Sequence, residues 1–149
     1  NHNDNNELSD FHGLKWGDIV GSCTDGNDFD YNLTENDNIT GFRFRCGGWM
    51  DAIQIHVNGK YKNHYGGNGG SQHHVSLHDN EYICDAIIIE NENSYVGGIA
   101  FKTNKKRIHC VCNTFTELFD DKLPNRKLIN VRGKYGSFLN QIQLQWKYF

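Results

Sequence analysis

The sequence predicts an all-β domain, and three observations lead to this fold class. The chain has 16 Gly and a single Pro in 149 residues, and its Val, Ile, Tyr and Phe residues fall in short runs, which is typical of strands joined by tight turns. Several runs alternate between apolar and polar residues, and no stretch of a dozen residues shows a convincing helical period. A strand–turn–strand pattern also recurs three times along the chain.

The recurring pattern covers three segments that align with one another. Its matched isoleucines, Ile53, Ile99 and Ile142, are 46 and 43 residues apart. A period of about 40–50 residues in an all-β chain is typical of propeller blades or of a threefold-symmetric barrel or prism. Since propellers usually need about four blades or more, three units favour a prism or a trefoil. The aligned segments are Phe42–Val57, Ile87–Thr103 and Ile129–Gln145.

The strands follow one another along the chain with clear turn signals between them. An opening strand and loop are expected from Trp16 to Tyr31. The first hairpin alternates on both sides of the turn Gly47–Asp51, so one of its faces is buried. Asn58-Gly59 is a strong signal for the next turn. Strands are expected at residues 39–46, 53–57, 72–77, 82–89, 96–101, 107–112, 128–131 and 138–149.

Length and charge bound the class of protein. A chain of 149 residues fits one domain, and its formal net charge is −3. This charge gives no electrostatic support for binding to nucleic acid or to an anionic membrane surface. No apolar run approaches the ~18 residues of a membrane span. Residues 1–10 are polar and acidic, so we expect a flexible arm or linker there and an ordered domain over residues 11–149.

Five cysteines suggest disulfide bonding. Cys110 and Cys112 share one face of any regular strand, so they will hardly pair with each other. We expect two disulfides and one free thiol, with a fully reduced set as the alternative. Sequons at Asn32 and Asn38 also fit a secreted or cell-surface protein. The cysteines are Cys23, Cys46, Cys84, Cys110 and Cys112.

Two glycine-rich stretches predict a small-ligand site. The turn Gly47–Asp51 delivers an aromatic residue and a carboxylate to one end of a hairpin, and the loop Gly66–Gly70 (GGNGG) follows fifteen residues after Asp51. A carboxylate accepts charge-assisted hydrogen bonds from neighbouring hydroxyls. Glycine lets a ligand approach bare backbone N–H groups.

Five motifs, taken in their order and spacing, resemble those of the jacalin-related lectins over roughly Gly17 to Trp146. They are GGWMDAIQI, YGGNGG, EYICDAIII, IAFKTNKK and GKYGSFLNQIQLQW, and the closing one is also similar to the animal zymogen-granule branch of the family. The resemblance implies a β-prism I fold of three four-stranded antiparallel Greek-key sheets. It also implies a non-enzymatic carbohydrate-binding protein with no catalytic residues, no cofactor and no metal.

In that family a sugar sits at one end of the prism. A hairpin aspartate takes two sugar hydroxyls, and backbone N–H groups of the same turn and of a neighbouring GG loop complete the site. Carried over to this chain, the resemblance implies a first-repeat site for mannose- or glucose-type glycans. Its residues are Gly48, Trp49, Met50, Asp51, Gly69 and Gly70.

The other two repeats depart from the family pattern. In the closing hairpin Asn140 replaces the aspartate, and an amide offers a single acceptor oxygen. We therefore expect a weak or degenerate second site there. In the second repeat Gly97 stands where the aspartate belongs, so that site is expected to be lost. The degenerate site comprises Gly26, Ser137, Phe138, Leu139 and Asn140.

Other interpretations of these residues remain open at the level of sequence. Asp51 fits an ordinary turn carboxylate, GGNGG a flexible loop, and Trp49 a core residue or an interface anchor. The histidines at 73, 74 and 78 fit a solvated strand better than a metal site. The alternative function is a degenerate jacalin-like module that serves protein–protein interaction or structure within a larger secreted or surface protein. Expected partners are glycans or glycoproteins, or other domains or subunits of such a complex.

Overall fold

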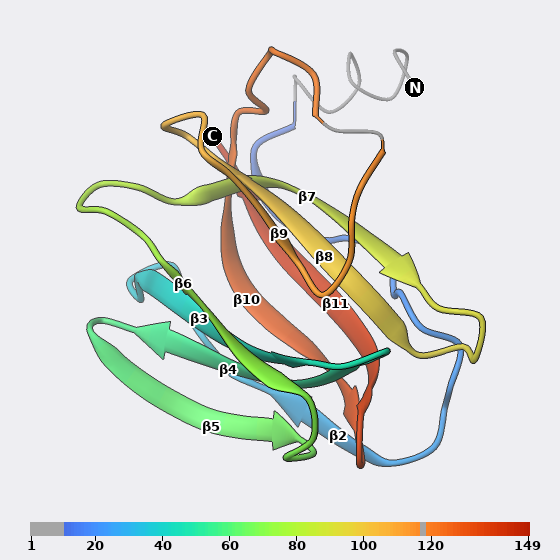
Figure 1. Cartoon of the computed structure of the whole chain (residues 1–149). Coiled ribbons are helices and arrows are strands. Elements are labelled where there is room, and N and C mark those ends of the chain that lie inside the picture. The colour runs from blue at the N-terminus through green and yellow to red at the C-terminus, as the bar shows by residue number, and fades with distance from the viewer. Residues whose placement is uncertain (1–10, 117–118) are drawn as a thin grey trace.

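The computed structural model describes residues 11–116 and 119–149, which form eleven strands in three antiparallel sheets (Figure 1). The all-β class and the three-sheet prism are therefore confirmed. The arm expected over residues 1–10 lies outside the described residues. Within the part of the chain that is described, no helix has the length and apolar character needed to span a membrane.

The sheet of the first repeat has the strand order β5-β4-β3-β6. Its central hairpin follows the predicted alternation, with Phe44 opposite Ile53 on the buried face and Arg43 opposite Gln54 on the outer face. Asp51 lies at the start of the second strand of this hairpin, directly after the turn. The strands are β3 (Ile39–Cys46), β4 (Met50–Val57), β5 (Lys60–Gly66) and β6 (Ser71–Ser76).

The sheet of the second repeat has the order β7-β8-β9, with three strands among the described residues where the resemblance implies four. The chain turns away after β9 at Cys112, which has a φ of 70° and is bonded to Cys46. The following residues lack apolar–polar alternation and include Pro124, which disfavours a fourth strand. The strands are β7 (Ile83–Glu90), β8 (Val96–Thr103) and β9 (Ile108–Val111).

The third sheet is built from both ends of the described chain, in the order β1-β11-β10-β2. The long hairpin β10–β11 forms its centre, and Gly13 of β1 pairs with Tyr148 of β11. The expected opening strand is in fact two short strands, with Val20 between them bridging to Ile142. The strands are β1 (Gly13–Trp16), β2 (Asn27–Asp30), β10 (Arg126–Tyr135) and β11 (Leu139–Tyr148).

Inward-facing side chains of all three sheets meet in one core. The Phe42 ring lies 5.0 Å from the Phe101 ring, between centroids, and so joins the first and second repeats. The three matched isoleucines, Ile53, Ile99 and Ile142, are at most 1% exposed. Burying a side chain of this size stabilises the fold by about 1.5–3 kcal/mol. The three repeats of the sequence therefore contribute equivalent buried residues to one shared core.

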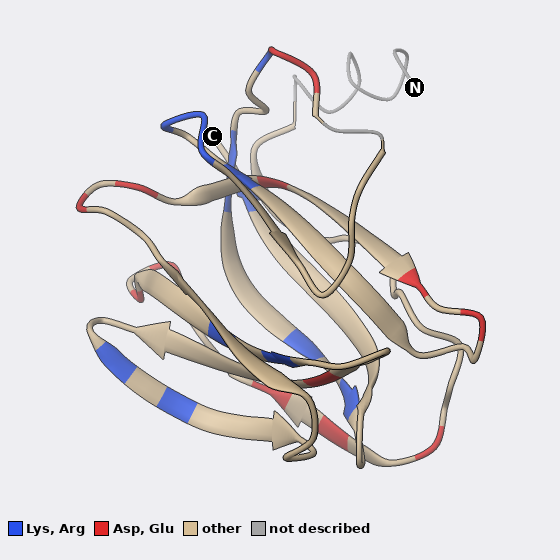
Figure 2. Cartoon of the chain, viewed as in Figure 1, with Lys and Arg blue, Asp and Glu red and all other residues tan. Residues whose placement is uncertain are grey.

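Charged residues occur in the loops and along several strands (Figure 2), and among the described ones only Asp51, Glu81 and Lys102 are buried. Glu81 is a buried exception that ties the β6–β7 connection to the β8–β9 turn. Its carboxylate accepts a hydrogen bond from Thr103 Oγ1 and pairs with Arg107 Nη1, each at 2.6 Å. Burial alone would raise the pKa of Glu81. Hydrogen bonds from the His78 backbone N–H and the Thr103 hydroxyl, together with the Arg107 guanidinium, hold this pKa below its usual value.

Candidate functional site

The β3–β4 turn and the β5–β6 loop meet at one end of the first-repeat sheet. The Gly67 N–H donates a hydrogen bond to the Asp51 carbonyl at 2.9 Å. Arg45 donates from Nε to the Gly69 carbonyl and from Nη2 to the Gly70 carbonyl, at 2.8 Å each. These bonds hold the glycine loop beside Asp51, as the sequence-based site requires.

Two glycines of this loop stand where a side chain would collide with its surroundings. A Cβ at Gly69 would lie 2.7 Å from Asp51 Oδ2. Gly70 has a φ of 69°, and a Cβ there would lie 2.4 Å from the Cys46 carbonyl oxygen. The atoms around Gly70 belong to the backbone, so only glycine fits there. A side chain at Gly69 would instead displace the Asp51 carboxylate from its place in the site.

Asp51 is 6% exposed, and the Oδ1 atom of its carboxylate is buried with no hydrogen-bond partner among the described residues. Burial raises the pKa of Asp51, while the Gly47 N–H and the charge of Arg45 act in the opposite direction. A buried acceptor without a partner costs about 1–3 kcal/mol, and such atoms in native proteins call for an explanation. A ligand hydroxyl is one group that would satisfy Oδ1.

A disulfide between Cys46 and Cys112 lies at the base of this site. It joins the end of β3, directly before the Gly47 turn, to the chain that follows β9. The expectation of two disulfides is wrong, because Cys23, Cys84 and Cys110 are free. Pairing requires Cα atoms within about 7 Å, and the distance between the Cα atoms of Cys46 and Cys112 is 5.1 Å.

Trp49 belongs to an aromatic cluster at the end of the prism. Its ring stacks on Phe138, with centroids 4.5 Å apart, and makes an edge contact with Tyr95 at 4.7 Å. All three rings are half-buried. Trp49 is therefore an anchor between hairpin tips, and Gly48 beside it faces open space.

Sequence reasoning missed Tyr95, although a signal for it was present. Each aromatic residue of the cluster directly precedes the first buried residue of the second hairpin strand in its repeat. These buried residues, Met50, Val96 and Leu139, are all 0% exposed. Aligning the three repeats on them places Trp49, Tyr95 and Phe138 at one position.

The structure also brings the residues of the second predicted site together, but the Asn140 side chain there is already hydrogen-bonded within the protein. Asn140 is 4% exposed, and its Nδ2 donates a hydrogen bond to the Asp25 carbonyl at 2.8 Å. A Cβ at Gly26 would lie 2.9 Å from the same nitrogen. The Asn140 amide thus holds the first loop, whereas Asp51 at the matched position has an unpartnered oxygen among the residues that the structure describes.

The second repeat has no carboxylate at the position that Asp51 occupies in the first repeat. Gly97 stands there, and a Cβ on it would lie 3.1 Å from the Asn91 side chain. The neighbouring Gly98 packs against Asn113 in the same way, at 2.8 Å. Side chains of this repeat fill the space that a glycine-lined site would leave open.

Comparisons with known proteins give the same fold. A sequence model of the jacalin-like lectin domain matches residues 18–145. The wild-type Malaysian banana lectin has a TM-score of 0.72 and 22% identity, over 92% of this chain and 100% of that one. A mannose-binding jacalin-related lectin from Ananas comosus has a TM-score of 0.70 and 18% identity, over 92% and 99%.

The fold also occurs in a larger animal protein. A lamprey immune protein has a TM-score of 0.75 and 19% identity, over 93% of this chain and 45% of that one. No curated protein matches the chain in sequence. Structural similarity at identities this low establishes only the fold. The match to the family's sequence model also establishes membership of the family. Since that match spans all three repeats, the chain belongs to the family of jacalin-like lectin domains.

Proposed function

We propose that this domain binds carbohydrate through the first-repeat site, with a preference for mannose- or glucose-type glycans. The observation that carries the proposal is the buried Oδ1 atom of Asp51, which lacks a partner among the described residues and lies beside bare glycine backbone. Matched residues in the other repeats are either hydrogen-bonded, as Asn140 is, or without a polar side chain, as Gly97 is.

Each residue of the site has a separate role in this proposal. The Asp51 carboxylate accepts hydrogen bonds from two neighbouring sugar hydroxyls. The N–H groups of Trp49, Met50 and Gly70 donate to ring or hydroxyl oxygens. The Met50 side chain takes no part, because it belongs to the buried core. Gly48 and Gly69 leave room for the ring.

The preference for mannose-type sugars is supported by relatives of the same fold. Two of the similar structures are described as mannose-binding, the lectin from Ananas comosus and one from Champedak. A single site of this kind binds weakly, since a millimolar dissociation constant corresponds to about −4 kcal/mol. We therefore propose that the domain acts in a multivalent protein, secreted or at the cell surface, on glycoproteins that carry several copies of the sugar.

An NMR titration with methyl α-mannoside tests the site. We expect saturable shifts of the amides of residues 47–51 and 66–70, and their loss in Asp51→Asn, which keeps the shape of the side chain. Asp18→Asn, which removes an exposed carboxylate elsewhere, is the matched control and leaves the shifts intact. Unchanged shifts in Asp51→Asn would refute the site. Silence across a broad glycan array would refute sugar binding and favour the interaction-module alternative.

A further inference from the structure

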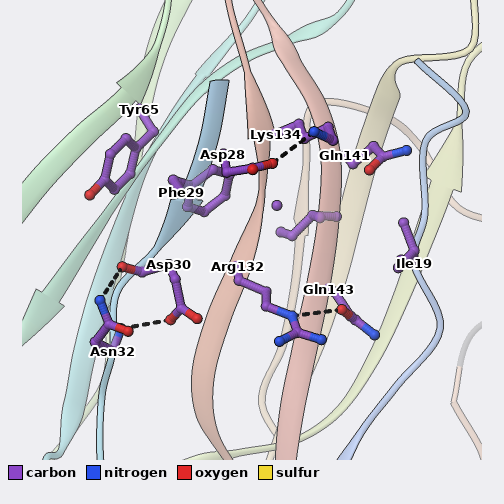
Figure 3. Close-up of a pocket in the computed structure, with 12 residues that line it drawn as sticks. Ile19, Asp28, Phe29, Asp30, Asn32, Tyr65, Arg132, Lys134, Gln141 and Gln143 are labelled. Carbon is purple, nitrogen blue, oxygen red and sulfur yellow. Dashed lines mark hydrogen bonds and ion pairs between the residues drawn. The ribbon is translucent and has the colours of Figure 1, made fainter. Parts of the chain in front are cut away.

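A pocket of about 590 Å³ lies on the outer face of the third sheet. It extends over β2, β10 and β11, between Tyr65 on one side and Ile19 on the other (Figure 3). None of the residues predicted for the first or second site lines it. Its volume falls within the ~300–1,000 Å³ typical of small-molecule sites.

The register of the sheet explains why polar side chains gather here. Asp30, Arg132 and Gln143 are direct neighbours across β2, β10 and β11 and form one row. Asp28, Lys134 and Gln141 form the next row, two residues along each strand. Residues two apart on a strand share a face, so both rows point the same way. Acidic segments of β2 accordingly lie beside basic segments of β10 in Figure 2.

Arg132 is held in a fixed orientation within this pocket. Its guanidinium carbon lies 3.8 Å from the centroid of the Trp16 ring, and its Nε donates to Gln143 Oε1 at 2.9 Å. Gln143 is held in turn by donating to the Gly17 carbonyl at 2.8 Å. Among the described residues no carboxylate lies within 4.0 Å of Arg132, and its two terminal nitrogens make no hydrogen bond. This cation is poised for an anionic group from outside.

The remaining groups of the pocket are mostly occupied. Lys134 pairs with Asp28 at 2.7 Å, so its charge is neutralised locally. Asp30 Oδ1 accepts from the Asn32 N–H at 2.7 Å and from Asn130 Nδ2 at 2.9 Å. Asp30 Oδ2 and the Gln141 amide have no hydrogen bond within the described part of the chain. The pocket thus offers one guanidinium fork, one carboxylate oxygen and one amide.

This combination of groups selects a class of ligand. A guanidinium fork matches the geometry of a carboxylate and binds it through two parallel hydrogen bonds. A carboxylate oxygen and an amide, by contrast, suit hydroxyl groups. An acidic sugar carries a carboxylate together with several hydroxyls and so offers a partner to each of these groups. We propose that the pocket binds an acidic monosaccharide unit, such as a uronic acid, with the sugar carboxylate on Arg132 and its hydroxyls on Asp30 and Gln141.

A pair of probes that differ only in the acidic group tests this proposal. Methyl β-D-glucuronide is titrated into the labelled protein alongside methyl β-D-glucoside, with NMR as the readout. The glucuronide is expected to shift amides of β2, β10 and β11 in a saturable way, and the glucoside is not. The same response is expected in Asp51→Asn, because this pocket is independent of the first-repeat site. Equal responses to the two probes would overturn the proposal.

Three variants locate the binding. Arg132→Gln is expected to weaken glucuronide binding at least tenfold, and Gln141→Ala severalfold. Lys134→Gln removes the same formal charge from the same pocket and is expected to change binding less than twofold. If Arg132→Gln fails to fold without its contact to Trp16, the glucuronide affinities of Gln141→Ala and Lys134→Gln decide whether the proposal stands. Equal losses in Arg132→Gln and Lys134→Gln, or no loss in Gln141→Ala, would mean unspecific charge attraction and overturn the proposal.

Discussion

The ring of Trp49 stacks on the ring of Phe138, with an interplanar angle of 16°. This contact joins the hairpin tip of the first repeat to that of the third, more than 80 residues later in the chain. Tyr95 closes the cluster from the second repeat through its edge contact with Trp49. The turn directly before Asp51 is therefore held by residues from all three repeats.

Replacing Trp49 is expected to destabilise this end of the prism. Trp49→Ala removes a half-buried indole and both ring contacts, so the free energy of unfolding should fall by about 1.5–3 kcal/mol. Trp49→Phe keeps a ring in the stack and should recover most of this loss. Urea unfolding followed by circular dichroism measures both. A change below about 0.5 kcal/mol in Trp49→Ala would contradict the anchoring role.

Asp51→Asn is expected to weaken sugar binding without loss of stability. Burial raises the folded-state pKa of Asp51. The folded protein therefore holds the Asp51 proton more tightly than the unfolded chain, and stability falls as pH rises from the ordinary Asp pKa through the folded-state value. Each pKa unit corresponds to about 1.4 kcal/mol.

Two measurements check this expectation. The stability of Asp51→Asn should equal or exceed that of the parent at pH 7, and its thermal midpoint should depend less on pH above the ordinary Asp pKa of 3.8. Sugar affinity of the parent should decrease on acidification, because the proposed grip needs the ionised carboxylate. A variant that is clearly less stable at pH 7 would mean that Asp51 is structural.

The reverse substitution at position 140, which matches Asp51 in the repeat, should lower stability. Asn140→Asp replaces a donor to the Asp25 carbonyl with a carboxylate, so two acceptors face each other in a buried place. We expect a loss of about 1–3 kcal/mol in stability at pH 7 and no gain of mannoside binding. Acidification should recover part of the loss, since the introduced carboxyl group can donate again once it is protonated. Thermal unfolding at pH 4 and pH 7 distinguishes the two conditions.

Much of this architecture is predictable from the sequence because short-range patterns encode it. The alternation of Phe42 and Phe44 with arginines gives the first hairpin, and the spacing of Ile53, Ile99 and Ile142 gives the threefold core. The glycine-rich turn that ends in a carboxylate suffices to suggest a ligand site. Each signal lies within one hairpin or in the comparison of one hairpin with another.

Features that depend on how distant segments meet were not predictable. The partner of Cys46 lies 66 residues away, and five cysteines allow many pairings. The pocket on the third sheet combines Ile19 and Asp30 with Arg132, which no local pattern connects. Among the described residues the second sheet lacks a fourth strand because of the turn at Cys112, whose backbone conformation is rare for a residue with a side chain.

Removal of the disulfide is expected to loosen the first-repeat site. The bridge closes a span of 66 residues, and loss of a native bridge of this kind costs about 2–5 kcal/mol. Dithiothreitol should lower the thermal midpoint of the parent but not that of a Cys46→Ala/Cys112→Ala double variant. Thiol titration of the unreduced, denatured protein should find the three cysteines that are free. A count of one would instead support two disulfides.

Glu81 is expected to govern stability in acid. Its hydrogen bonds and its pair with Arg107 hold its folded-state pKa below the usual value, although burial opposes them. The stability that it contributes is present above the ordinary Glu pKa and is lost as pH falls through the folded-state value. Glu81→Gln should therefore cost about 1–3 kcal/mol at pH 7, since Arg107 is partly exposed, and clearly less near pH 3. Glu92→Gln, at an exposed position, serves as the control in the same thermal unfolding series.

The third sheet imposes an order on biosynthesis. Its flanking strands β1 and β2 leave the ribosome first, whereas their partners β11 and β10 are made after every other described strand of the domain. The first two repeats contain all the described strands of their own sheets and can assemble while the chain is still growing. Until the closing hairpin emerges, β1 and β2 present unpaired edges to other nascent chains. We therefore expect efficient production of the domain to depend on keeping its earliest strands from pairing with other chains until translation of the domain is complete.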